Sequence, residues 1–314
     1  MVACRPAKPP LMNILESCKI YVQNENKIIM QTGKGWFALL YNEVNTVLSA
    51  IFDSHTHSDN SHDGHHPISF MGETAESKGM AGFCVTDHFE CNMPEEKHTT
   101  RLRDSFYESA MAREAFGGRL LITSGIELGQ ATQNLPLAEK FLKQYDFDFV
   151  LGSLHNLQGQ RDLCHYQFEG MDVQKIILEY YAQMLELCQW GKFDVLAHMT
   201  YPLRYIMGIQ KILVDLTPVD EVIGEILTVL VKKDKGLEIN TSTLRQGLGE
   251  TMPSLRYVKL FRELGGKYIT LGSDAHYAEH IGSNFSDGLA LAKEAGFDHF
   301  TVYRKREPQL HKIG

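Results

Sequence analysis

Histidines and carboxylates are concentrated in one short stretch, residues 53–66, which reads DSHTHSDNSHDGHH. Five of the chain's 14 histidines lie there, with three aspartates. His55 and His57 are two residues apart, so on an extended backbone their imidazoles point to the same side. Paired imidazoles of this kind are common metal ligands. The stretch follows an apolar run, Leu48–Phe52, which we expect to be a buried strand. The sequence therefore predicts a metal site where that strand ends.

The composition is that of an ordinary globular protein, with 43% hydrophobic and 22% charged residues among 314. A net charge of −8 and the lack of a long basic run argue against a nucleic-acid partner, but bound metals could still attract a small phosphorylated substrate. The six cysteines form no CxxC pair, as expected for reduced thiols. There is neither a long apolar run nor a signal-peptide pattern. We therefore expect a cytoplasmic protein with no membrane partner.

Strand and helix patterns alternate from about residue 48 onward, with helices expected at 101–116 and 172–188 and a last strand at His299–Tyr303. This alternation predicts an α/β protein with a parallel sheet, most simply a barrel; an open doubly wound sheet is the alternative. The glycine-rich dinucleotide fingerprint is missing after the first strand. We expect residues 48–314 to form one domain. Residues 1–47 are an N-terminal extension of unknown role, with a strand or hairpin near residues 20–30.

Six successive expected strands end in residues that can bind a metal. They are His55 with His57, His88, Glu127, His155, His198, and Asp274 with His276. In a parallel barrel these ends converge on one face, where active sites are built. One histidine at a strand end is usually structural, but six such ends in succession favour a metal centre. One catalytic zinc needs about three protein ligands, so the number of ligands predicts two or three divalent ions. Mixed histidine and carboxylate ligands suit Zn, Mn or Fe.

These motifs resemble the PHP superfamily, named after polymerase and histidinol phosphatase domains. The resemblance rests on the His-x-His motif and on Thr-Asp-His at 86–88, Gly-Ile-Glu at 125–127, Ser-Leu-His at 153–155, Leu-Ala-His at 196–198 and Ser-Asp-Ala-His at 273–276. It covers residues 49–307. The segments 238–245 and 272–303 are similar to the histidinol-phosphate phosphatases in particular. The resemblance implies a distorted (β/α)7 barrel with a trinuclear metal site at the carboxyl ends of its strands.

The resemblance also implies how the ligands are divided. The first metal would take His55, His57, Glu127 and Asp274. The second would share Glu127 and add His155 and His198. The third would take His88, His276 and a residue of the first loop. For that last ligand Asp63, just before Gly64, fits better than His62. Seven histidines match no ligand motif: His65, His66, His98, His165, His280, His299 and His311.

The expected ligands suit phosphate ester hydrolysis. Clustered divalent ions lower the pKa of a bound water toward about 7 and stabilise in-line displacement at phosphorus. We expect Glu127, Asp274 and His276 to act in catalysis, with Asp274 or a nearby histidine protonating the leaving group. A phosphate also needs an arginine fork. The candidates follow expected strand ends and are, in order of preference, Arg204, Arg161 and Arg245, the last of which could instead be structural.

The expected function is that of a metal-dependent phosphatase that hydrolyses L-histidinol phosphate in L-histidine biosynthesis, as the resemblance implies. Glu90 is a candidate for reading the substrate's amine or imidazole. One alternative is a broader PHP phosphoesterase acting on nucleotides or other small phosphate esters. Another is a non-catalytic metal-binding module, which would be expected to have lost ligands.

Overall fold

The computed structural model describes residues 19–24, 27–32, 35–40 and 51–314. The chain divides into two compact units, Met1–Ser49 and Ala50–Gly314. In the first unit, strands β1 (Lys19–Asn24), β2 (Lys27–Thr32) and β3 (Gly35–Leu40) form an antiparallel sheet. The pairing of β1 with β2 confirms a hairpin near residues 20–30. Residues 48–50 of the expected first strand lie outside the described residues.

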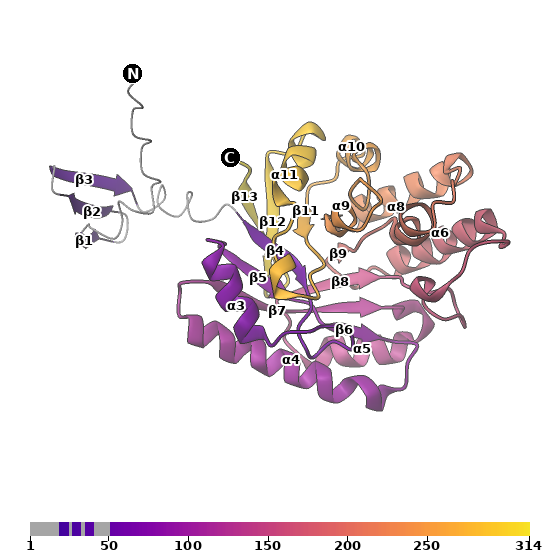
Figure 1. Cartoon of the computed structure of the whole chain (residues 1–314), viewed down its shortest axis with the longest axis horizontal. Helices are drawn as coiled ribbons and strands as arrows, with labels where there is room; N and C mark the ends of the chain where they lie inside the picture. Colours follow the sequence, from indigo (N-terminus) through magenta and orange to yellow (C-terminus); the bar gives the residue numbers. More distant parts are fainter. Residues whose placement is uncertain (1–18, 25–26, 33–34, 41–50) are drawn as a thin grey trace, which may run out of the picture. The chain divides into compact units, whose positions relative to one another are not determined.

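Seven parallel strands form the barrel of the second unit (Figure 1). In spatial order they are β4 (Phe52–Thr56), β5 (Gly82–Val85), β7 (Leu121–Gly129), β8 (Phe149–Ser153), β9 (Val195–Leu196), β10 (Gly236–Asn240) and β11 (Ile269–Gly272). The first and last strands meet, since the His57 amide donates to the Ala275 carbonyl at 2.8 Å and the Asp274 amide to the His55 carbonyl at 2.9 Å. This closure confirms a seven-stranded barrel over an open sheet. The two-residue β9 makes the barrel irregular.

Helices surround the strands in Figure 1 and cover their apolar outer faces. The longer ones are α3 (Ile68–Ser77), α4 (Glu95–Phe116), α5 (Leu135–Gln144), α6 (Val173–Trp190), α8 (Asp220–Lys232), α10 (Leu255–Glu263) and α11 (Phe285–Glu294). α6 buries Ile177, Tyr181 and Met184 at helical spacing, as the sequence predicts. α4 begins six residues before the expected position 101, directly after Pro94, and Glu95 and Glu96 favour its amino end. In the described part of the chain, no helix is apolar over enough length to span a membrane.

Two expectations about strands need correction. The first strand does not end at Phe52 as expected: β4 continues to Thr56, where it pairs with β5, and so includes His55. The strand expected at 299–303 exists as β12 (His299–Arg304), but it pairs antiparallel with β13 (Glu307–Lys312) outside the barrel. The turn of this hairpin contacts the barrel at the amino end of β9, where Arg306 Nε donates to Asp194 Oδ2 at 2.6 Å. The barrel therefore closes after β11, without the last expected strand.

Candidate metal centre

Glu127 occupies the middle of a cluster of ligands at the carboxyl ends of the strands. It lies on β7 and is fully buried. Its Oε1 is 2.8 Å from His198 Nε2 and 3.0 Å from His155 Nε2. Its Oε2 is 2.8 Å from His88 Nδ1, yet these two buried atoms make no hydrogen bond. Two orphaned buried ligand atoms this close together fit coordination of a shared cation. One carboxylate thus faces several imidazoles from different strands.

A first group of ligand atoms surrounds the other side of Glu127 Oε2. His55 Nε2 and His57 Nε2 are 3.0 Å apart and lie 3.5 and 3.6 Å from this oxygen. Asp274 Oδ1 is 3.8 Å from His55 Nε2 and 3.5 Å from His57 Nε2. Ligands at about 2.0–2.1 Å from a tetrahedral zinc are roughly 3.3–3.4 Å from one another. The four atoms therefore have the spacing needed to hold one ion between them.

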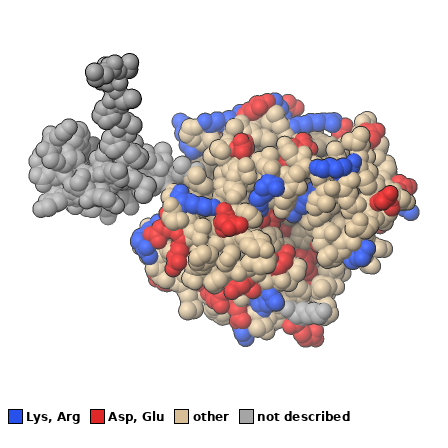
Figure 2. Space-filling model, viewed as in Figure 1, with Lys and Arg blue, Asp and Glu red and all other residues tan. Residues whose placement is uncertain are grey.

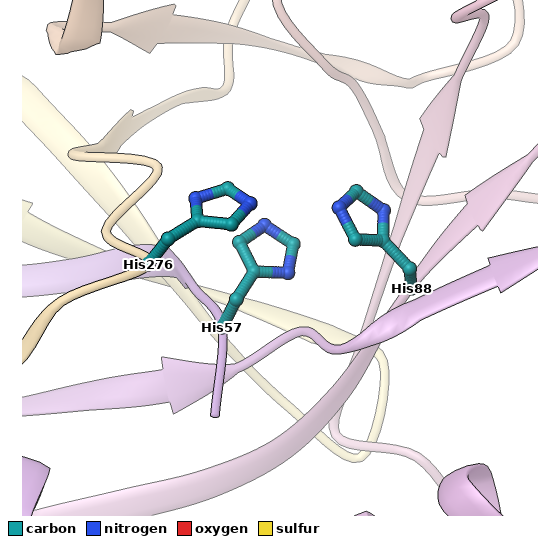
Figure 3. A group of neighbouring side chains, drawn as sticks. All are labelled: His57, His88 and His276. Atoms are coloured by element: carbon teal, nitrogen blue, oxygen red, sulfur yellow. The ribbon is translucent and has the colours of Figure 1, made fainter. Parts of the chain in front are cut away.

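Two further groups border the first. His155 Nε2 and His198 Nε2 are 3.4 Å apart and share Glu127 Oε1. On the opposite side, the rings of His57, His88 and His276 turn toward one another (Figure 3), with ligand atoms within 4.8 Å. They come from the end of β4, from the short strand β6 (His88–Glu90) and from the loop after β11. Every metal-ligand residue predicted from the strand ends thus lies in one cluster.

The first loop presents Asp63 to the third group. Asp63 Oδ2 is 3.1 Å from His276 Nε2, and its Oδ1, buried without a hydrogen bond, is 3.7 Å from His88 Nε2. His62 is more exposed, at 60% against 42% for the Asp63 side chain. A Cβ on Gly64 would lie 1.8 Å from the Ser58 carbonyl oxygen, so only glycine allows the loop to fold back here. The geometry favours Asp63 over His62.

The buried carboxylate of Asp87 supports the first loop and, through Ser61, the ligand candidate His57. Asp87 accepts hydrogen bonds from the hydroxyls of Ser58 at 2.6 Å, Ser61 at 2.9 Å and Ser105 at 2.5 Å. Ser61 Oγ in turn lies 3.2 Å from His57 Nδ1. Asp87 therefore connects the first loop to α4. Sequence reasoning missed this role, although an aspartate beside a ligand histidine at the end of a buried strand was a usable signal.

Glu90 makes a contact that the sequence did not predict. Its Oε1 lies 3.0 Å from His155 Nδ1, on the side of the ring away from Glu127. A carboxylate in this position fixes the ring orientation and leaves Nε2 free for a metal. Glu90 also borders the cavity described below, but its carboxylate is engaged by His155. This contact indicates that Glu90 orients His155, and its expected role in reading the substrate stays a prediction.

The cluster has strongly perturbed proton affinities. Burial alone would raise the pKa of Glu127, but His88 and His155 hold it well below its usual value. Burial alone would lower the pKa values of His88 and His155, but Glu127 raises both well above the ordinary histidine value. For His57, burial and the neighbouring His88 lower the pKa. Without bound metal, some imidazoles therefore carry protons at neutral pH and His57 stays neutral.

The raised pKa values of His88 and His155 predict that metal binding releases protons. A metal takes the neutral imidazole, so His88 and His155 must lose their protons when an ion binds. We expect Zn²⁺ affinity to rise with pH from 6 to 8, because their raised pKa values keep them protonated at the lower end. Calorimetric titrations of metal-free protein in two buffers with different ionisation enthalpies measure the released protons. Equal heats in both buffers would contradict the prediction.

The cluster opens into a cavity of about 770 Å³. Arg161 and Arg204 line it, as expected of phosphate-binding residues. Arg204 is buried, donates to Asp274 Oδ2 at 2.6 Å and to Ser242 Oγ at 2.7 Å, and has an unpartnered Nε. Arg245 lies outside the lining and donates to the carbonyls of Ser273 and Asp274. We therefore assign Arg245 a structural role in place of the predicted phosphate contact.

The histidines that match no ligand motif lie apart from the ligand groups, with two near the cavity. His98 and His165 are among its lining residues. His65 stacks on Tyr277, and His66 Nδ1 accepts from the Ala278 amide at 3.1 Å. These last two histidines therefore support the loop after β11 from the first loop.

Comparison with known proteins agrees with this geometry. The family model described as the PHP domain matches residues 53–242, which is more than half of the chain. The chain belongs to the PHP family. The matched segment runs from β4, which carries His55, to Ser242, two residues after the end of β10.

Two relatives of this PHP chain match over more than nine-tenths of their own length. A probable histidinol-phosphatase from Thermotoga maritima is 28% identical over 256 residues, covering 82% of this chain and 97% of the relative. A histidinol-phosphatase from Lactococcus lactis is 28% identical over 257 residues, covering 80% and 93%. A solved histidinol phosphate phosphatase from the same organism, in complex with zinc, L-histidinol and phosphate, superposes with a TM-score of 0.70. It is 24% identical and covers 83% of this chain and 99% of that one, and this likeness establishes the shared fold.

Proposed function

We propose that this PHP protein hydrolyses L-histidinol phosphate to L-histidinol and inorganic phosphate, a step of L-histidine biosynthesis. The observation that carries the proposal is the Glu127-centred ligand cluster opening into a cavity beside Arg204. The names of the relatives support the substrate, and a structural neighbour was solved with L-histidinol and phosphate. A cytoplasmic location and the absence of nucleic-acid and membrane partners stay predictions.

The proposed cofactor is a set of divalent ions held by nine residues. One ion would lie among His55, His57, Glu127 and Asp274, a second among Glu127, His155 and His198, and a third among Asp63, His88 and His276. The spacing of the ligand atoms supports this division. Zinc is supported by the Lactococcus lactis neighbour, and Mn or Fe would suit the same ligands.

The metals would supply a nucleophilic oxygen at neutral pH and neutralise charge on the phosphoryl group. The protein's own residues orient the substrate. Arg204 is held rigidly by Asp274 and Ser242, so its guanidinium enters the reaction already ordered. Arg161 stacks on Tyr166 at 5.4 Å, which leaves its N–H groups available to a phosphate at the cavity. His276 is 24% exposed at the cavity wall, beside the position proposed for the third ion.

Asp274 fits a different role from the proton donor that the sequence suggested. Burial alone would raise its pKa, but Arg204 and His55 hold the pKa well below the usual aspartate value. An aspartate that stays ionised cannot donate a proton at neutral pH. We therefore propose Asp274 as a metal ligand that also anchors Arg204.

The test is hydrolysis of a substrate panel by metal-loaded protein. L-Histidinol phosphate, nucleoside monophosphates and sugar phosphates are compared by the rate of phosphate release. We expect L-histidinol phosphate to have the highest kcat/KM. Faster turnover of nucleotides would favour the broader phosphoesterase and keep the reaction class. On the face shown in Figure 2, acidic and basic side chains are interspersed, which gives no support to nucleic-acid binding on that face.

Arg204→Ala is expected to lower kcat/KM about 10²- to 10³-fold, the range for loss of one preorganised charge-stabilising group. Arg204→Lys should recover little, since Nη2 alone makes the contacts to Ser242 and Asp274, and an ammonium has no counterpart of the unpartnered Nε that is left for a phosphate. Steady-state kinetics on L-histidinol phosphate measure both variants. Arg119→Ala is the control, because this arginine is exposed and pairs with Glu76 on the surface. An Arg204→Ala enzyme within threefold of wild type would remove Arg204 from the phosphate site.

A further inference from the structure

Glu238 is a carboxylate in the interior of the barrel that no step above uses. It lies at the centre of β10, whose five residues are all buried, and its own exposed fraction is 0%. Its neighbours Leu237 and Ile239 belong to the apolar core outside the strands. By strand alternation Glu238 points the opposite way, into the barrel. A buried carboxylate is costly unless it is paired, so its partners indicate what it does.

The two oxygens of Glu238 bind two ligand-bearing residues. Oε1 lies 2.7 Å from His55 Nδ1. Oε2 accepts from the His198 backbone amide at 2.7 Å and from Asn240 Nδ2 at 3.2 Å. His55 and His198 belong to different proposed metal groups, which meet at Glu127. One buried carboxylate therefore contacts a member of each group, through the His55 ring and the His198 backbone amide.

The contact with His55 sets the tautomer of that ring. With Nδ1–H donated to Glu238, the lone pair of His55 is on Nε2, which faces His57, Glu127 and Asp274. A carboxylate behind a ligand imidazole fixes its orientation and increases its basicity. His55 is thereby prepared for a metal at Nε2.

The contact with His198 replaces a missing strand pairing. The ladder between β9 and β10 ends at the pair Leu196 and Leu237. The next ligand, His198, lies beyond that ladder, and its amide finds an acceptor in Glu238 Oε2. The side chain thus fixes the backbone position from which the His198 imidazole reaches Glu127.

Gly272 leaves the space through which the Glu238 side chain reaches His55. β10 and β4 are not neighbours, because β11 lies between them. A Cβ on Gly272 of β11 would lie 2.0 Å from Glu238 Oε1 and 2.7 Å from His55 Cβ. The Glu238 carboxylate therefore passes β11 at Gly272, which has no side chain. This independent feature of the fold accommodates the contact between Glu238 and His55.

We propose that Glu238 is a positioning residue that couples two metal subsites by holding His55 through its ring and His198 through its backbone. The inference rests on the proposed metal ligation by these histidines. It predicts that loss of the carboxylate weakens both subsites together. Glutamine keeps the shape but offers one acceptor oxygen, while both His55 and His198 present donors, so one of them must lose its partner.

The test is a Zn²⁺ titration of full-length metal-free protein in competition with a chromogenic chelator. For Glu238→Gln we expect Zn²⁺ affinity to fall about 10- to 100-fold at the two subsites, the usual effect of losing such an outer partner. Thr270→Val is the matched control, since Thr270 is buried two residues before Gly272 on β11 and its hydroxyl is unpartnered. We expect wild-type affinity for that variant. Thermal unfolding of each metal-free variant separates loss of affinity from loss of folding.

Each outcome decides one claim. Wild-type protein that takes up no Zn²⁺ would remove the proposed metal centre. Wild-type uptake with unchanged affinity in Glu238→Gln, whether or not the metal-free variant is less stable, would overturn the coupling role alone. If Glu238→Gln does not fold, nitrogen-15 NMR of zinc-loaded wild-type protein replaces it. A proton on His55 Nδ1 and metal at Nε2 support the proposal, and the opposite tautomer overturns it.

Discussion

Replacement of Glu127 by glutamine is expected to lower kcat/KM for L-histidinol phosphate by at least about 10³-fold, the upper range for one charge-stabilising group. The expectation follows from the position of Glu127, whose oxygens face imidazoles of both the first and second proposed metal groups. The amide keeps the shape and loses the charge, so the affinity for more than one ion should fall. Steady-state kinetics and elemental analysis of the same preparation measure both effects.

The control for this experiment lies on the same strand. Thr123→Val changes a buried residue of β7 whose hydroxyl is unpartnered, and we expect activity close to wild type. A Glu127→Gln protein that retains activity within about tenfold of wild type would contradict the proposed centre, since tenfold corresponds to only about 1.4 kcal/mol of transition-state stabilisation. That result would mean that catalysis does not depend on the ligand cluster around Glu127.

Removal of the metals should abolish activity and lower stability. After dialysis against a chelator, the imidazoles around Glu127 take up protons. Their positive charge then compensates the Glu127 carboxylate in place of the metals. We expect phosphate release to fall to background and to return on adding back Zn²⁺, Mn²⁺ or Fe²⁺, with the restoring ion identifying the preferred metal. Ligand present at 100 times its Kd stabilises a fold by about 2.7 kcal/mol, so Tm should rise on reloading.

Elemental analysis before and after dialysis supplies the stoichiometry. Three ions per chain would support the division into groups around His55, His155 and His276, and two would remove the third group. Retention of full activity in protein shown to be metal-free would exclude the metal-dependent mechanism. Unchanged Tm with lost activity would mean that the ions serve chemistry without stabilising the fold.

Much of the barrel could be predicted from local sequence. Apolar runs of strand length alternate with helical spacing, and each run that ends in a polar group marks a carboxyl end of a strand. This pattern was sufficient to select eight of the nine proposed ligand residues and to place them on one face. It failed at β12, because an apolar run does not reveal whether its partner strand is parallel or antiparallel.

The first loop and the arginines were harder to assign. Asp63 and His62 are adjacent and both can bind metal, and only the folded loop turns Asp63 toward His276. Arg204 and Arg245 both follow strand ends. The former lines the cavity while the latter holds carbonyl groups of the loop after β11. Sequence position does not distinguish these cases, because side-chain direction depends on the loop's folded path.

By itself, then, the sequence determined which residues are candidate ligands and which face they share, because both depend on short-range periodicity. Only the tertiary structure decided which ligands meet. Closure of the barrel brings β4 beside β11, so His55 meets Asp274 from the far end of the chain. The same closure, with Gly272 at the crossing, lets Glu238 reach His55 across 183 residues of sequence. Contacts of that range depend on the curvature of the whole sheet, which no local pattern encodes.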